Sequence, residues 1–301
     1  MGKWINTLGY QVRGLPVLVI MQFLSWLRPA YARILSIPLA AILRVIARRR
    51  MLIAALNIKT CFPEKNRKQK KQLLLQHSRQ LIYGLYETTQ AVKPNADLLP
   101  PHKLSGLEAV QNCINAKQGV ILICGHFSGM DLWLRLVGEY LPITAVHRPL
   151  KNPLMQRYFV AGRVRSSTSL ISKHQPRAML KALKAGCVLG LQSDQNSRGK
   201  NSRFIDFFGI PAATSISPWW LAQKSGATIF SMQPTKQWRS GAYHYEIKIK
   251  PMEIPLDNSK PELLLSLINQ QLELSARSQP ASYWWVHRRF KTRPVGEPTF
   301  Y

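Results

Sequence analysis

The alternation of short apolar runs with helical patterns constrains the fold more than any other feature of this sequence. Between residues 119 and 250, buried-strand patterns alternate with segments whose apolar residues recur every three or four positions. We expect strands at residues 119–126, 142–146, 168–172, 187–194, 227–234 and 243–250, and helices at residues 67–92, 131–141, 153–162, 176–185, 216–225 and 260–276. This order predicts an α/β fold with a mixed, mostly parallel sheet flanked by helices.

The length and composition fit one such domain. A chain of 301 residues that is 46% hydrophobic is long enough to bury a full core. The sequence contains no internal repeat, low-complexity tract or long linker that would divide it. We therefore expect an N-terminal anchor with a basic flank over residues 1–50 and a single α/β domain over residues 51–301.

The N-terminal segment is apolar and bordered by basic residues. Residues 14–27 form an uncharged run, shorter than the roughly 20 residues that cross a bilayer squarely. A second apolar run, residues 34–43, precedes three consecutive arginines at residues 48–50. Aromatic rings and arginines settle at headgroup depth. We expect a hydrophobic membrane-anchoring helix, with an apolar helix docked on the protein's own core as the alternative.

The net charge of +28 requires an anionic partner. A nucleic acid, an anionic membrane leaflet and a phosphorylated substrate all satisfy that requirement. The basic clusters flank the apolar N-terminus and lie in no recognised nucleic-acid-binding motif. The sequence therefore favours an anionic lipid and a membrane surface as partners, and no nucleic acid.

The cysteines and histidines do not form metal-binding patterns. The four cysteines are widely spaced, and none of the seven histidines belongs to an H-E-x-x-H motif or to another ligand pair at helical spacing. Unpaired cysteines are typical of a reduced compartment, which indicates a domain that faces the cytosol. We expect no metal and no cofactor.

A histidine lies where an expected strand ends. His126 closes the strand at residues 119–126, and Asp131 follows five residues later, where a helix should begin. A histidine takes up a proton near neutral pH, and a carboxylate on its other ring nitrogen fixes the tautomer. Gly125 and Gly129 permit the tight turn between them. The H-x-x-x-x-D spacing alone, however, is also compatible with His126 as a structural histidine whose hydrogen bonds are satisfied within the protein.

Several separated segments together resemble one family. The chain is similar to the late lipid A acyltransferases of Gram-negative bacteria, a branch of the lysophospholipid acyltransferase superfamily that uses such a histidine and carboxylate. The segments that carry the resemblance are NIKTCFPE (57–64), GHFSGMD (125–131), HRPLKNPL (147–154), GRVR (162–165), SDQ (193–195), FFG and AT (207–209 and 213–214) and WWVHRRFKTRP (284–294).

The resemblance implies a glycerol-3-phosphate acyltransferase-like fold and an acyltransferase activity. Acyl carrier protein would be the partner that supplies the acyl thioester, and an acylated, phosphorylated glucosamine disaccharide would accept it. The enzyme would lie at the bacterial inner membrane, with its catalytic domain on the cytoplasmic side. Acceptors of glycerophospholipid or phosphoinositide-mannoside type remain the alternative, because a site and not a fold decides the substrate.

The same resemblance assigns roles to individual residues. His126 would be the general base of a direct transfer and Asp131 its orienting carboxylate. Arg163 would stabilise the oxyanion, with Arg165 as a second choice for that role or a substrate-binding residue. The remaining substrate-binding candidates are Arg148, Asp194, Gln195, Thr214, Arg288 and Arg289, and for Asp194 and Gln195 a structural hydrogen-bonding role is an equal possibility.

Overall fold

The main sheet of this protein is central and mixed. The computed structural model describes residues 2–166, 169–253 and 260–301. Its seven-stranded sheet has the order β1-β9-β8-β2-β5-β3-β4. The strands are β1 (His102–Ser105), β2 (Val120–Cys124), β3 (Ile143–His147), β4 (Ser169–Ser172), β5 (Val188–Gln192), β8 (Thr228–Arg239) and β9 (Ala242–Pro251).

Most neighbouring strands of this sheet run parallel. The pairs β8·β2, β2·β5, β5·β3 and β3·β4 are parallel, and helices connect them in the chain. These helices are α6 (Met130–Gly138), α7 (Pro153–Ser166), α8 (Pro176–Lys184) and α9 (Ser217–Ser225). Every residue of β2 is buried, as expected for a central strand covered on both faces. The predicted α/β class and its mixed, mostly parallel sheet are confirmed.

The antiparallel part of the sheet is a hairpin with a tight turn. β8 and β9 are joined by Ser240 and Gly241, which both have positive φ, 48° and 79°. A two-residue turn of this kind matches the twist of the strands it joins. β1 then adds to the outer edge, parallel to β9, after the short η1 helix (Ala96–Leu98) and before α5 (Leu107–Asn115).

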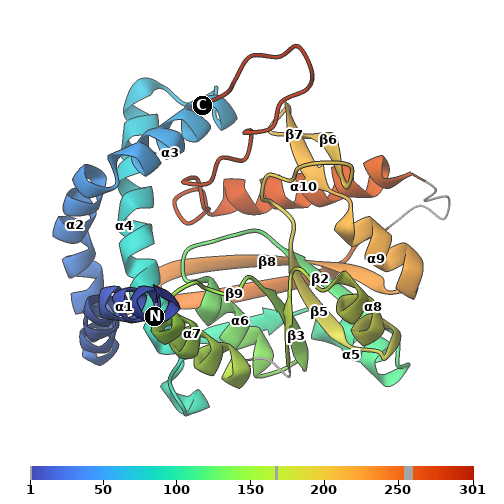
Figure 1. Cartoon of the computed structure of the whole chain (residues 1–301), viewed down its shortest axis with the longest axis horizontal. Helices are drawn as coiled ribbons and strands as arrows, with labels where there is room; N and C mark the ends of the chain where they lie inside the picture. Colours follow the sequence, from blue (N-terminus) through green and yellow to red (C-terminus); the bar gives the residue numbers. More distant parts are fainter. Residues whose placement is uncertain (1, 167–168, 254–259) are drawn as a thin grey trace.

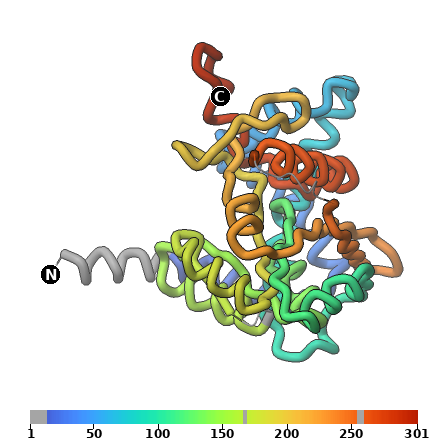
Figure 2. Tube along the Cα trace, turned by 90° about the vertical axis from the view of Figure 1, so that its right-hand side faces the viewer, coloured from blue at the N-terminus to red at the C-terminus, as the bar shows by residue number. Residues whose placement is uncertain are grey.

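A second, two-stranded sheet was not expected from the sequence. It consists of β6 (Ser202–Phe207) and β7 (Ile210–Ser215), which pair antiparallel. β6 packs against α10 (Pro261–Ser278), and Asn269 of that helix donates to the carbonyl of Asp206 at 2.9 Å. In both views of the chain, α10, the small sheet and α3 lie together at the top, and α7 and α8 lie below them (Figures 1 and 2).

The N-terminal part of the chain is a layer of helices around α4. They are α1 (Gly2–Trp26), α2 (Pro29–Ile46), α3 (Arg48–Cys61) and α4 (Arg67–Ala91), and α1, α2 and α3 all contact α4 (Figure 1). A capping box between Asn66 and Gln69 begins α4. Residue 50 lies inside α3, so the expected limit of the anchor falls within a helix and not between two elements.

The face that α2 turns outward is apolar. Ala32, Ser36 and Ala40 recur every four residues and are buried, whereas the large side chains of Ile34 and Val45 are 63% and 76% exposed. Within the described ranges, α2 is the helix that is long and apolar enough to cross a membrane, and Gly14–Trp26 is a shorter apolar helix. Small residues therefore hold α2 to the protein, and its large apolar residues face away from it. This arrangement is compatible with membrane association.

Candidate active site

The carboxyl ends of β2 and β5 bring His126 and Asp194 together. In the parallel pair of strands, Cys124 lies opposite Gln192, and His126 and Asp194 each follow two residues later. The ring Nδ1 of His126 donates to Oδ1 of Asp194 at 2.5 Å, and the backbone N–H of His126 donates to Oδ2 at 2.8 Å. Both carboxylate oxygens are thus used to fix one residue, in position and in ring orientation.

This contact decides which nitrogen of His126 is free to act. A ring nitrogen that faces a carboxylate carries the proton, which leaves a lone pair on the other nitrogen, Nε2. Gln195 Nε2 donates to that lone pair at 3.0 Å. The His126 side chain is 23% exposed, whereas that of Asp194 is 3% exposed. His126 Nε2 is therefore an accessible base whose partner on the far side is buried.

Asp194 remains ionised in this setting. Burial by itself raises the pKa of Asp194, but the charge of His126 and hydrogen bonds from His126 and Tyr283 outweigh it and lower the pKa to about 2. Asp194 therefore presents a buried negative charge to Nδ1 of His126.

Asp131 does not hold His126, which corrects the contact expected from the sequence. Asp131 lies in the first turn of α6, and its Oδ1 accepts from Nε of Arg163 on α7 at 2.7 Å. The ring of His126 instead bonds to Asp194 and Gln195. Spacing along the chain could not reveal this, because β5 reaches the site only through its pairing with β2. Asp131 and Arg163 form a second, neighbouring pair of charges.

Helix α4 packs against the turn that follows His126. Gly129 has φ +70°, and a Cβ built there would lie 2.2 Å from Oε2 of Glu87. Glu87 is fully buried, and its Oε1 accepts from Lys236 Nζ and from the Tyr245 hydroxyl, both at 2.6 Å. A side chain at position 129 would therefore need both a strained backbone and a displaced carboxylate. The contact with Glu87 therefore explains why the turn requires glycine at position 129.

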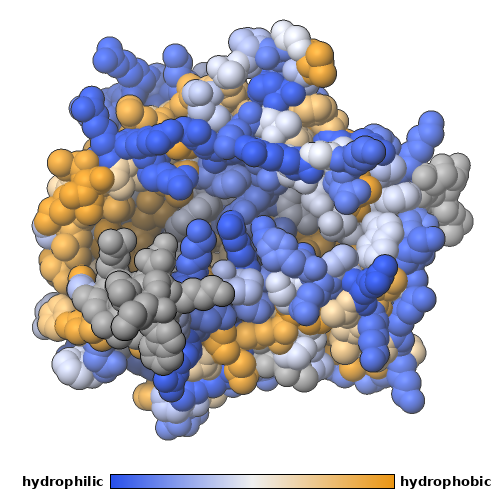
Figure 3. Space-filling model, in the orientation of Figure 1, coloured by the Kyte–Doolittle hydropathy of each residue, from blue (hydrophilic) through white to orange (hydrophobic). Residues whose placement is uncertain are grey.

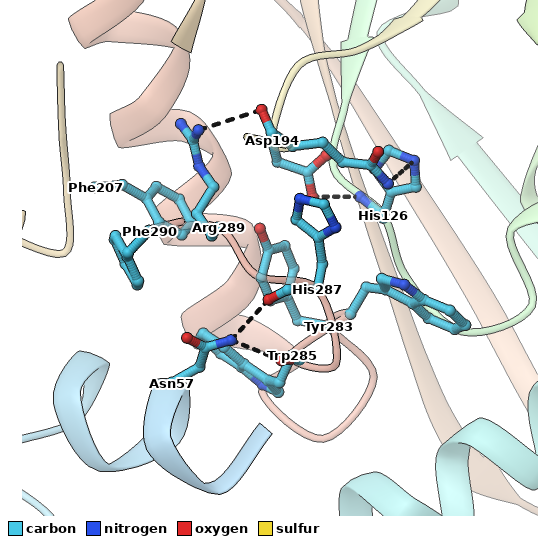
Figure 4. Close-up of a pocket in the computed structure, with 11 residues that line it drawn as sticks. Asn57, His126, Asp194, Phe207, Tyr283, Trp285, His287, Arg289 and Phe290 are labelled. Atoms are coloured by element: carbon cyan, nitrogen blue, oxygen red, sulfur yellow. Dashed lines mark hydrogen bonds and ion pairs between the residues drawn. The ribbon is translucent and has the colours of Figure 1, made fainter. Parts of the chain in front are cut away.

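The C-terminal segment packs against the turn that contains His126. Trp284 donates its backbone N–H to the carbonyl of His126 at 3.0 Å, and Ser128 donates to the carbonyl of Ser282 at 2.8 Å. Asn57 of α3 holds the same segment, because its Nδ2 donates to the carbonyl of Trp285 at 2.7 Å. In Figure 4, His287 and Tyr283 of the C-terminal segment lie between Asn57 of α3 and the His126–Asp194 pair, and all of these residues line one small cavity. Residues from the two ends of the chain thus complete one site.

Comparison with known proteins identifies the family to which this chain belongs. The sequence model of the bacterial lipid A biosynthesis acyltransferases matches residues 9–292, nearly the whole chain. The chain belongs to this family. It is an acyltransferase of lipid A biosynthesis, which confirms the resemblance seen in the sequence.

Named relatives of this lipid A acyltransferase differ in the acyl group. The lipid A biosynthesis lauroyltransferase of Escherichia coli K12 is 31% identical over 84% of this chain and 83% of its own length. The palmitoleoyltransferase of the same strain is 29% identical over 87% of this chain and 86% of its own length. Its myristoyltransferase is 20% identical, over 83% and 77%. The first two relatives are almost equally similar, so overall similarity does not assign the acyl chain.

Two predicted substrate-binding residues of the acyltransferase, Arg289 and Thr214, have buried side chains. Arg289 is 3% exposed and donates to the carbonyl of Ala213 at 2.9 Å and to the hydroxyl of Thr214 at 2.7 Å. Thr214 is 0% exposed. Both side chains are enclosed, and Arg289 also donates to the carbonyl of Gln195 at 3.3 Å. They join the small sheet to the loop that carries Gln195, and Arg289 also lines the small cavity that contains His126.

The other predicted arginines lie at different distances from the chemistry. Arg148 follows β3 and is exposed. Arg165 is exposed at the end of α7 and donates to the carbonyl of Val92. Arg163 is held by Asp131, and its guanidinium lies 5.5 Å from the centre of the Phe159 ring. Arg288 faces a cleft beside α3. The structure therefore brings Asp194 and Gln195 to His126, and it groups Arg163 with Asp131.

Tyr283, His287 and Asn57 line the same small cavity as His126, although the sequence did not indicate any of them as a site residue. Tyr283 donates a hydrogen bond to Asp194. Burial lowers the pKa of His287 to about 4, and its Nε2 accepts the Asn196 N–H at 3.1 Å, so this histidine is neutral at pH 7. Asn57 and His287 lie within family segments, but the sequence offered no sign that residues from both ends of the chain would meet.

Proposed function

We propose that this acyltransferase moves a fatty acyl chain from acyl carrier protein to a hydroxyl of an acylated, phosphorylated glucosamine disaccharide, with His126 as general base. The observation that carries the mechanism is the contact of His126 Nδ1 with Asp194 at 2.5 Å, from which we infer a lone pair on Nε2. A base of this kind contributes about 10²- to 10⁴-fold to a rate.

In the proposed reaction, the acceptor hydroxyl takes the place of the Gln195 amide at His126 Nε2. The imidazole removes the hydroxyl proton while the oxygen attacks the thioester carbonyl carbon. A tetrahedral intermediate forms with a negative charge on the former carbonyl oxygen. When it collapses, the C–S bond breaks and the imidazolium returns its proton to the thiolate. Asp194 holds the ring and stabilises its positive charge throughout.

Arg163 is our candidate for stabilising the negative charge of that intermediate. It lies on α7, its charge acts on His147 at the end of β3, and the ion pair with Asp131 at 2.7 Å fixes the direction of its guanidinium. Both side chains are partly exposed, 25% for Arg163 and 16% for Asp131. In this proposal Asp131 is a positioning residue that acts through Arg163, and the nearby oxyanion receives donors that are already oriented.

Direct transfer is favoured over an acyl-enzyme because the nearby nucleophile candidates are buried. Ser128 is 2% exposed and Cys124 is 7% exposed. Burial raises the pKa of the Cys124 thiol, with Asp194 adding to the effect. A thiol that stays protonated is a weak nucleophile. The hydroxyl of the acceptor remains the simplest nucleophile for His126 to activate.

The cytoplasmic face of the bacterial inner membrane is the proposed location. The exposed apolar side chains of α1 and α2 would enter the bilayer, and the basic residues that follow would meet anionic headgroups. Hydrophobic side chains gather on the left of the molecule in Figure 3, over α1 and α2. The same surface would bring the active site to an acceptor that is itself a membrane lipid.

Transfer by wild type and His126→Ala in parallel tests this proposal. We expect wild type in detergent to move a radiolabelled acyl group from acyl carrier protein to the lipid A precursor, and His126→Ala to lose this activity by at least about 10²-fold. Cys124→Ser, which changes the adjacent strand end without removing the base, should keep most activity. Turnover of His126→Ala at the wild-type rate would contradict the mechanism. If only lysophosphatidate were labelled, the proposed mechanism would stand but the proposed acceptor would be wrong.

A further inference from the structure

A basic cleft lies beside the active site and has no role in the reaction just described. It has a volume of about 690 Å³ and lies between the junction of α2 with α3 and the C-terminal segment. Five basic side chains line it, namely Arg49, Arg50, Arg198, Arg288 and Lys291. They come from three separate parts of the chain, so the fold and not a local sequence run assembles them.

The positive charge of this cleft is not compensated by acidic groups. None of its lining residues is an aspartate or glutamate, and none of the ion pairs among the described residues involves the five basic side chains. Arg50 donates to the carbonyl of Val286 at 3.4 Å, and the Arg288 guanidinium lies 5.6 Å from the Tyr301 ring centre. Like charges gathered in this way repel one another unless an anion binds between them.

The chemistry of the side chains favours a phosphate group. An arginine presents a planar fork of donors that fits phosphate oxygens in pairs, and a lysine adds a compact charge. Arg49, Arg198 and Lys291 lie in three different segments, so they can approach one anion from several sides. The cleft is recessed, which suits a small polyanion better than the convex surface of a folded protein.

The surroundings of the cleft indicate that the phosphate belongs to a lipid. Ile46 and Ile53 line the same cleft, and Ile46 is 77% exposed at the end of the apolar face of α2. In Figure 3 a hollow bordered by hydrophilic side chains opens beside the apolar patch over α1 and α2. An amphiphile bound here would place its charged headgroup among the arginines and its acyl chains along α2.

The cleft also adjoins the catalytic histidine. His287 lines both this cleft and the small cavity that contains His126. Asn196, another lining residue, is held by His287 Nε2 at 3.1 Å and directly follows Gln195, whose amide contacts His126 Nε2 at 3.0 Å. A large acceptor can therefore occupy the cleft with one end and present a hydroxyl to His126 with another.

We propose that this cleft binds a phosphate group of the acceptor lipid, away from the hydroxyl that reacts. The proposal rests on the proposed function, because it assigns a binding site to the acceptor of that reaction. Its consequence is selectivity: the enzyme would recognise its acceptor by the anionic headgroup as well as by the hydroxyl.

A double variant, Arg198→Gln with Lys291→Gln, tests the proposal against a matched control. The control, Arg177→Gln with Lys184→Gln, removes the same two charges from exposed positions on α8. With the phosphorylated acceptor, we expect the cleft variant to raise KM about tenfold or more, since each charge-assisted contact is strong, and to leave KM for acyl carrier protein unchanged. With phosphatase-treated acceptor, wild type and both variants should have the same KM.

The outcomes separate the sources of the effect. An increase in KM for acyl carrier protein alone would make the cleft a docking site for that protein and overturn the proposal. An equal loss with the phosphatase-treated acceptor would show that no phosphate is bound there. Inorganic phosphate that competed in wild type as strongly as the phosphorylated lipid would reduce the site to one for a free anion.

A binding measurement keeps this test independent of turnover. Retention of the labelled phosphorylated lipid in mixed micelles is compared between wild type and the two double variants. We expect the cleft variant to retain about tenfold less lipid than the control. If wild type transferred no acyl group but the cleft still discriminated the phosphorylated lipid, the proposed function would fail, and only the binding of a phosphorylated lipid in the cleft would stand. Equal retention by all three proteins would overturn the inference, whatever the turnover.

Discussion

At the scale of single residues, the site depends on which carboxylate faces which cation. Two acidic side chains lie close to the strand ends, and each has its own partner, Asp194 with His126 and Asp131 with Arg163. Asp194 is enclosed and accepts from both the ring and the backbone of His126. Asp131 is partly exposed on a helix turn. This division predicts different consequences when each carboxylate is removed.

We expect Asp194→Asn to lower kcat by about 10²-fold or more, because an amide neither fixes the Nδ1–H tautomer nor stabilises the imidazolium. The loss should come with an altered pH profile of kcat, since the charge beside His126 changes. Asp131→Asn should lower kcat because Arg163 loses the ion pair that orients its guanidinium, and it should keep the wild-type pH profile. Steady-state rates between pH 5 and pH 9 measure both variants. Identical pH profiles for the two variants would argue against Asp194 as the partner of the base.

At the scale of elements, α4 ties the two ends of the chain to the sheet. His77 on α4 is fully buried, and its Nδ1 donates to the carbonyl of Ala281 at 3.0 Å. Its Nε2 has no hydrogen-bond partner among the described residues. Burial lowers the pKa of His77 to about 4, with the bond to Ala281 opposing the shift. The folded protein therefore keeps this histidine neutral at pH values where an unfolded chain protonates it.

The consequence is a loss of stability in acid. Between about pH 6.5 and pH 4 the unfolded chain binds a proton at His77 and the folded chain does not, so the free energy of unfolding falls as the pH falls. The contribution is about 1.4 kcal/mol per pH unit within this window. We expect His77→Gln to show a shallower pH dependence of unfolding by denaturant, in detergent, than His174→Gln, which changes an exposed histidine. Parallel pH dependences would contradict the prediction.

At the scale of the whole molecule, an apolar surface and a basic surface lie next to each other. The outward face of α2 carries the apolar part, and the cleft beside α3 carries the basic part. Such a pair of surfaces is typical of proteins that rest on an anionic membrane. Because small residues attach α2 to α4, its large side chains can be changed without disturbing the core.

We expect Ile34→Glu with Val45→Glu to weaken membrane association and to leave folding intact. Both side chains are mostly exposed in the protein, and each would lose roughly 1.5–3 kcal/mol of burial in the bilayer. Leu263→Glu with Leu274→Glu, on exposed positions of α10, is the control. Sedimentation with membrane vesicles measures the difference, and turnover in detergent should be equal for both variants. If the α2 variant sedimented with vesicles as wild type does, the basic C-terminal segment and not α2 would be the membrane anchor.

Much of this architecture could be predicted from local patterns in the sequence. Apolar runs and helical spacing predicted the strands and crossover helices, because burial on both faces of a parallel sheet requires apolar strands. The place of His126 at the end of a strand followed from the same pattern, and the ordered segments predicted the family. The small sheet could not be predicted in this way, because β6 carries polar residues, Arg203 and Asp206 among them, and pairs with another strand along one edge only.

The partners of the site residues were decided by the tertiary structure. Asp194 meets His126 because β5 pairs with β2, although 68 residues separate the two side chains in the chain. Arg289 is enclosed because the C-terminal segment folds under the small sheet, whereas its sequence reads as a basic surface. The basic cleft likewise draws on three segments. Local periodicity determines which residues form a strand or a helix, but strand order and chain packing determine which side chains meet.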